Sequence, residues 1–309
     1  MIRFYLKALV TLAIIILLLR EMDLDAVVHY VLSIKPVYLV IATALGLLIS
    51  VVASVRWYYV IRATGYCLTS YRALQLTMVG TFFNQILPTA MGGDLARIPY
   101  AHQSGLPLGS AVNCVVLDRV VAMIALVLLV LITLPLALPV LGTTHARWAL
   151  VAIAAGGLAG AAVILGMAYI PGRLSHPALK PVMALSLSLR EAVAGRFAPA
   201  VMISGIVVHL VRIITVYVIS VGMQLDIAFS DCLILVPPAL LVTVLPVSIG
   251  GWGIREAAFV IAFGLVGLPT EQAFALSVIF GVTILIAALL GAPFWIFLRK
   301  QDGVQNDKP

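Results

Sequence analysis

The chain has 309 residues, of which 63% are hydrophobic and only 10% charged, and its formal net charge at pH 7 is +7. Soluble globular domains carry roughly 25% charged residues, and a core of this size cannot hide such an apolar excess. The composition excludes a soluble protein and predicts an integral membrane protein. Its positive charge then reflects orientation in the membrane rather than nucleic-acid binding.

Six apolar stretches provide the roughly 20 residues that a helix needs to cross a bilayer. They are residues 1–19, 37–55, 107–134, 148–170, 200–222 and 275–298. The first is followed by "LREMDLD", which lacks the small residues of a cleavage site, so we interpret it as a retained helix and not a signal peptide. The sequence therefore predicts an all-α polytopic membrane protein with about six transmembrane helices.

Basic residues indicate the orientation of these spans, because cytoplasmic loops are enriched in lysine and arginine. With six crossings, one side collects Arg3, Lys7, Arg56, Arg62, Arg72, Arg173, Lys180, Arg190, Arg196, Arg299, Lys300 and Lys308. We predict that this side is cytoplasmic. Both termini, including a short tail at 301–309, then lie inside, and the protein is located in the inner (cytoplasmic) membrane.

Two further apolar segments, 73–92 and 231–268, are left over from this count. A single crossing by either would move every later loop to the wrong side. Each is therefore predicted to enter and leave by the same face as a re-entrant helical hairpin, the first from the cytoplasm and the second from outside.

The two leftover segments carry related motifs. "LPTAMGGDLAR" begins at Leu87 and "LPVSIGGWGIR" begins at Leu245, and both have the form L-P-x-x-x-G-G-x-x-x-R. "GLPLGSA" at 105–111 and "GLPTEQA" at 267–273 follow in the same order. Units that repeat in sequence but enter from opposite faces form an inverted repeat, which is common in transporters.

We place the repeat units at about 73–135 and 231–298, within a single transmembrane domain of residues 1–300. Proline removes a helix donor and paired glycines permit a sharp turn. The predicted hairpin turns are at Pro88, Gly92, Gly93, Pro246, Gly250 and Gly251.

Arg97 and Arg255 follow the glycines by about one helical turn. Broken helix ends leave free N–H groups suited to a phosphate or carboxylate, and the two arginines would add full charge to a shared, water-accessible pocket. The alternative is a pair of kinked helices whose arginines extend to the membrane interface.

Several ionisable residues fall near the predicted midplane. Asp118, Arg119, His209 and Arg212 all lie deep within apolar spans, where a lone charge costs at least about 2.5–3.5 kcal/mol. They should pair or line a polar cavity, and a structural Asp118–Arg212 pair is one alternative. Asn84 would line the same cavity or bond to a neighbouring helix.

Other features favour simpler interpretations. Cys67, Cys114 and Cys232 are far apart and are predicted to be buried thiols, and neither a metal site nor a cofactor is expected. Residues 173–198 have bases and an apolar stripe, which predicts an interfacial amphipathic helix.

Motifs over nearly the whole chain resemble one family, the flippase-like transmembrane region of bacterial lysylphosphatidylglycerol synthases. They are N-x-x-L-P followed by G-G-D-x-x-R, a D-R pair in the next helix, and G-G-x-G-x-R-E. By these motifs the resemblance implies functional roles for Asp94, Arg97, Asp118, Arg119, Arg255 and Glu256. Fused members carry a soluble aminoacyl-transfer domain, which is not expected here because the sequence ends nine residues after Lys300.

The resemblance implies a lipid translocase, not an enzyme, that moves a phospholipid or glycolipid between leaflets. Its expected headgroup-binding residues are Asn84, Asp94, Arg97, Asp118, Arg119, Arg212, Arg255 and Glu256. The expected partners are membrane lipids with anionic headgroups and not nucleic acid; a homo-oligomer and envelope-synthesis proteins stay open. The alternatives are an accessory or scaffold protein of envelope lipid or polysaccharide synthesis and an intramembrane lipid-modifying transferase.

Overall fold

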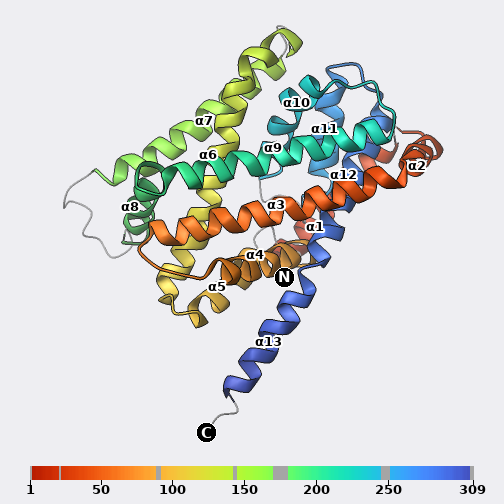
Figure 1. Ribbon diagram of the computed structural model, residues 1–309. Helices are drawn as coiled ribbons and strands as arrows, with labels where there is room; N and C mark the ends of the chain where they lie inside the picture. The colour runs from red at the N-terminus through yellow and green to blue at the C-terminus, as the bar shows by residue number, and fades with distance from the viewer. Residues whose placement is uncertain are drawn as a thin grey trace.

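The computed structural model describes residues 2–20, 22–87, 92–141, 145–169, 180–244 and 251–306, and these are all helical or connecting segments without a β-strand (Figure 1). The helices are α1 (Ile2–Arg20), α2 (Leu24–Ser33), α3 (Pro36–Ala63), α4 (Ser70–Ile86), α5 (Gly92–Gln103), α6 (Leu108–Leu141), α7 (His145–Met167), α8 (Lys180–Ala194), α9 (Ala198–Gly222), α10 (Phe229–Val242), α11 (Ile254–Gly264), α12 (Thr270–Leu289) and α13 (Ala292–Asn306).

Five helical stretches of the described chain are long and apolar enough to cross a membrane: α3, α6, α7, α9, and α12 continued by the start of α13. They coincide with five of the six predicted spans. The all-α polytopic fold is therefore confirmed. The sixth, α1, is a helix of 19 residues, but its described apolar part, Ala8–Arg20, is shorter than the other spans, so its crossing stays a prediction.

Several boundaries differ from the sequence prediction, and two of the differences matter most. Helix α3 continues to Ala63 instead of ending at residue 55, so Arg56 and Arg62 belong to the helix and not to a cytoplasmic loop. The apolar and aromatic residues around each arginine, in "VRWYYVIRA", allow the helix to continue packing. The last span is interrupted between Leu289 and Ala292, where α12 gives way to α13.

Each leftover segment contributes to a pair of short helices that pack against each other, α4 with α5 and α10 with α11. The first pair extends past the predicted end at residue 92, because α5 runs from Gly92 to Gln103. At about 1.5 Å per residue these helices are about 16–26 Å long, less than the roughly 30 Å of a bilayer core. Their lengths fit helices that enter a membrane part of the way.

The two hairpins pack into separate apolar cores. Trp57 of α3 packs with residues of α4, α5, the first half of α6 and α13. Residues of α10 and α11 pack with α9, α12 and the second half of α6. Helices α3 and α9, which lie side by side, run between these two regions (Figure 1). Both hairpins contribute residues to a cavity at the junction of these two regions.

Two smaller predictions have mixed outcomes. The described part of the predicted amphipathic segment forms α8, which packs against α6, α7 and α9, and residues 173–179 lie outside the described chain. Cys114 and Cys232 are buried as expected, but Cys67 is exposed because it lies in the connection between α3 and α4.

Candidate functional site

A cavity of about 410 Å³ with several charged side chains in its wall lies at the junction of the two halves. Both hairpins contribute to its wall, together with α3, α6, α9 and α12. Its charged and polar lining residues are Ser50, Arg56, Thr77, Thr81, Asn84, Gln85, Asp94, Arg97, Asp118, Arg119, His209, Arg212, Thr243 and Arg255. Five arginines among these, in so apolar a protein, make the cavity the chemically distinctive place in the structure.

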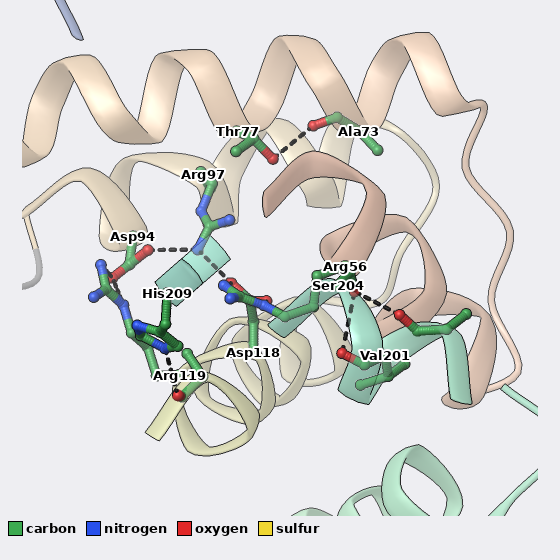
Figure 2. A network of polar contacts seen from close by, with 12 residues as sticks. Arg56, Ala73, Thr77, Asp94, Arg97, Asp118, Arg119, Val201, Ser204 and His209 are labelled. Carbon is green, nitrogen blue, oxygen red and sulfur yellow. Dashed lines mark hydrogen bonds and ion pairs between the residues drawn. The ribbon is translucent and has the colours of Figure 1, made fainter. Parts of the chain in front are cut away.

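A chain of alternating charges forms one wall (Figure 2). Asp94 bridges Arg119 and Arg97, which both contact it closely. Asp118 bridges Arg97, at 3.4 Å from Nη2, and Arg56, whose Nε lies 2.7 Å away. The chain ties α3, α5 and α6 together.

This chain holds three arginines and two aspartates, so it keeps one positive charge. Asp94, Arg97 and Asp118 are at most 4% exposed, whereas the Arg119 side chain is 44% exposed. Burying charges without partners costs several kcal/mol, which the alternating arrangement avoids. Arg119, at the exposed end, is the member that can leave its partner at the lowest cost.

The first hairpin positions Arg97 by close backbone packing. A Cβ at Gly93 would overlap the Gly80 carbonyl oxygen, and Asn84 Oδ1 accepts a hydrogen bond from Gly93 N at 3.0 Å. The Arg97 side chain then crosses Gly80 and lies over the Trp57 ring, 4.6 Å from its centroid. Stacking on an aromatic face adds a cation–π attraction. Asn84 thus closes the hairpin as well as lining the cavity.

The second hairpin presents a self-contained ion pair. Arg255 Nη2 and Nε donate to Glu256 Oε1 at 2.6 and 3.1 Å, and Ser277 Oγ donates to the same oxygen at 3.3 Å. Glu256 Oε2 accepts from Gly253 N at 2.5 Å. The Arg255 guanidinium lies 4.4 Å from the Trp252 ring centroid. Both hairpins therefore hold an arginine between a tryptophan and a carboxylate.

Helix α9 supplies two residues of a different kind. His209 is buried, and its Nε2 lies 3.1 Å from the Ala122 carbonyl oxygen. Arg212 is partly buried, and no described residue forms a hydrogen bond or ion pair with it. The α9 arginine is thus the cavity cation without a carboxylate in the described part of the chain.

Seven of the eight expected headgroup-binding residues line this cavity, Arg97 and Arg255 included. Glu256 does not, because it is turned to Arg255, Ser277 and the start of α11. Gly92 and Gly93, predicted to lie in the first hairpin turn, are instead the first two residues of α5. Gly251, in the second predicted turn, has the left-handed φ of +83° that glycine tolerates. Pro88, Pro246 and Gly250 lie outside the described residues.

The alternative of a structural pair between Asp118 and Arg212 is wrong. Asp118 is occupied by Arg56 and Arg97. Sequence reasoning missed Arg56 because it placed this arginine in a loop. The signal that could have found it is the apolar run that continues past residue 55 on both sides of Arg56.

The described residues include no group of three or more histidine, cysteine, aspartate or glutamate side chains with the spacing of a metal site. The chemistry of the cavity is instead that of guanidinium groups, which bind phosphate and carboxylate oxygens through fixed donor pairs.

The fold and the cavity define a polytopic helical membrane protein with a charged chamber between two helical hairpins. The family model "Lysylphosphatidylglycerol synthase TM region" matches residues 4–291, and the chain belongs to this family.

One relative extends the comparison. The UPF0104 membrane protein MJ1595 of Methanocaldococcus jannaschii is 31% identical over 108 residues, which cover 34% of this chain and 32% of that protein. The match thus spans about a third of the relative's length. No solved structure matches the chain.

Proposed function

We propose that this protein is a lipid translocase, which moves an anionic phospholipid or glycolipid headgroup between leaflets through the cavity. The observation that carries the proposal is that both hairpins bring an arginine to one polar chamber inside an otherwise apolar helical bundle. Irregular backbone at membrane depth is tolerated only where it is buried in protein or lines a wet cavity. The family, named for the membrane region of a lipid enzyme, agrees with a lipid ligand.

In this mechanism the hairpins re-enter from opposite faces, the first from the cytoplasm, and both termini are cytoplasmic. The headgroup passes through the cavity while its acyl chains remain in the bilayer. The exposed Arg119 exchanges Asp94 for the incoming anion and later takes Asp94 back. Because the ionic partners are replaced one at a time, no buried charge is left alone during passage.

Translocation can be measured with purified protein in vesicles that contain a trace of fluorescently labelled phosphatidylglycerol. A membrane-impermeant reductant bleaches only the outer-leaflet label in protein-free vesicles, and it should bleach the inner-leaflet label as well when the protein is present. Arg97→Gln should slow this exchange about tenfold or more, because it removes charge-assisted contacts in the cavity. Arg255→Gln should also slow the exchange, but by a smaller factor, because Glu256 already balances this arginine.

Arg190→Gln is the control, since Arg190 lies on α8 outside the cavity, where it forms an exposed ion pair with Glu191 and lies over the Tyr169 ring. Thermal unfolding of each variant separates loss of transport from loss of fold. An unchanged rate in folded Arg97→Gln and Arg255→Gln proteins would contradict the proposal. A protein without any exchange would favour an accessory role, and formation of a modified lipid would favour a transferase.

A further inference from the structure

The five arginines of the cavity are not equivalent. Arg56, Arg97, Arg119 and Arg255 each contact a carboxylate, and the Asp118, Asp94 and Glu256 partners are all buried. The remaining arginine, Arg212, forms neither a hydrogen bond nor an ion pair with any residue that the structure describes. The available positive charge is therefore on the α9 side of the cavity and not shared equally between the two hairpins.

The surroundings of Arg212 increase its need for an anion. Arg56 and Arg119 are the charged groups close enough to act on it, and both are positive. The aspartates of the neighbouring helices do not balance the charge of Arg212, because Asp94 and Asp118 are already paired with Arg56, Arg97 and Arg119. A partly buried guanidinium beside two like charges is unfavourable in a membrane interior until an anion joins it.

His209, one helical turn before Arg212, adds a nitrogen that needs a hydrogen-bond donor. Its Nε2 faces the Ala122 carbonyl oxygen, which can only accept, so Nε2 carries the proton. In the neutral ring Nδ1 is then an acceptor, and this atom is buried without a hydrogen-bond partner among the residues that the structure describes. Since His209 lines the same cavity and is only 3% exposed, the unpartnered nitrogen suits a hydroxyl donor from a bound ligand.

We infer that Arg212 and His209 form a headgroup subsite, in which Arg212 binds a phosphate and His209 Nδ1 accepts from a hydroxyl of the same headgroup. The ligand class is a phosphate ester with a polyol or sugar headgroup. The inference rests on the proposed function only in taking this ligand to be a lipid. The second hairpin then has a different role: Arg255, neutralised by Glu256, shapes the cavity wall and contributes less to anion binding.

The experiment measures equilibrium binding to the purified full chain in phosphatidylcholine nanodiscs. Four dioctanoyl or soluble probes separate the contributions: phosphatidylglycerol, phosphatidylmethanol with the same charge but no hydroxyl, diacylglycerol without phosphate, and glycerol 3-phosphate without acyl chains. The wild-type protein should bind phosphatidylglycerol more tightly than phosphatidylmethanol, and diacylglycerol most weakly. If glycerol 3-phosphate binds as tightly as phosphatidylglycerol, the ligand of the subsite is a soluble phosphate ester and not a lipid.

Arg212→Gln should weaken both phosphate lipids about tenfold or more, to the level of diacylglycerol. His209→Phe should remove the preference for phosphatidylglycerol over phosphatidylmethanol, a ratio that is independent of the amount of folded protein. Arg190→Gln on α8 is the matched control and should bind as wild type. Unchanged phosphate affinity in Arg212→Gln, or an unchanged ratio in His209→Phe, would overturn the corresponding half of the subsite.

Thermal unfolding without added lipid gives an independent check. Removal of an unpaired cation beside Arg56 and Arg119 should leave the melting temperature of Arg212→Gln equal to or above that of the wild type. A clearly lower melting temperature would mean that Arg212 has a structural partner, and would overturn the inference. If Arg212 is needed for binding but the protein does not translocate lipid, the proposed function is wrong and the subsite stands. If the protein translocates lipid but binding does not depend on Arg212, the subsite is wrong and the proposed function stands.

Discussion

At the scale of single residues, two aspartates organise the cavity. Asp118 of α6 receives Arg56 from α3 and Arg97 from α5, so one carboxylate joins three helices. The pair with Arg56 uses both Asp118 oxygens, at 2.7 and 3.2 Å, and this bidentate geometry suits guanidinium. A surface pair such as Arg190–Glu191 has no comparable role, because both of its side chains are more than a third exposed.

Asp118→Asn should therefore destabilise the protein strongly. The substitution keeps the shape of the side chain but removes the negative charge that balances two buried arginines, which lowers the free energy of unfolding by about 3 kcal/mol or more. Thermal or denaturant unfolding in detergent measures the loss. Glu191→Gln, which removes the acid of the exposed pair, should cost less than about 1 kcal/mol. Equal losses in the two variants would mean that the buried charges are solvated by water and not held by one another.

Part of this residue-level arrangement can be predicted from sequence. Asp94, Arg97, Asp118 and Arg255 stand out because charge is rare in apolar segments and therefore marks a polar interior. Their pairing does not follow in the same way. Helix tilt and side-chain reach decide whether Asp118 meets Arg56 or Arg212, and neither is encoded in residue spacing along one helix.

At the scale of helices, the first hairpin depends on close approach of its backbones. Gly93 is the second residue of α5, and the position that a Cβ would take there is filled by the Gly80 carbonyl oxygen and by Asn84 of α4. Small residues perform this role in membrane helix pairs, where apolar burial alone gives little attraction between helices. The Asn84–Gly93 hydrogen bond fixes the same contact.

Gly93→Ala should separate α4 from α5 and move Arg97. The added methyl group overlaps backbone that cannot rotate away, and such overpacking costs about 1–3 kcal/mol. Gly109→Ala is a matched control, because Gly109 is also the second residue of its helix, α6, and a Cβ there meets nothing within 4 Å. That change should be neutral or slightly stabilising, by up to about 1 kcal/mol. Unfolding midpoints of both variants provide the measurement, and a neutral Gly93→Ala would contradict the close contact.

Helix identity is easier to predict than helix ends. Long apolar runs identify α3, α6, α7 and α9 because about 20 apolar residues have few other structural solutions. The end of α3 is misplaced by eight residues because Arg56 resembles a loop charge when its partner on α6 is unknown. The gap between α12 and α13 is equally hidden, since Leu290 and Gly291 lie within an apolar run.

At the scale of the whole molecule, the two hairpins differ in chemistry although each is a packed pair of short helices. Each hairpin packs into its own apolar core and leads into a long helix, yet one arginine joins a five-residue charge chain and the other forms a closed pair. Such divergence is expected if the two halves act at different stages of one passage: the charged half and α9 bind the headgroup, and the neutral half forms the opposite wall.

The inversion of the two halves makes a prediction about accessibility. If the hairpins enter from opposite faces, the connection after α5 is cytoplasmic and the connection before α12 is external. Gln103 and Thr270 are exposed residues at these two places, and the exposed native Cys67 provides a third position, expected inside. Single cysteines at Gln103 or Thr270, placed in a Cys67→Ser background, can be compared with the native cysteine by using a membrane-impermeant maleimide.

Only the cysteine that replaces Thr270 should react in sealed, right-side-out cells. Cys67 and the cysteine that replaces Gln103 should react only after the membrane is permeabilised. Cys114 and Cys232 are buried and should contribute little background. Labelling of the Gln103 and Thr270 positions from the same side would mean that one hairpin traverses the bilayer. The two arginine-bearing turns could not then reach a common chamber from opposite leaflets, and the proposed passage of a headgroup between them would lose its physical basis.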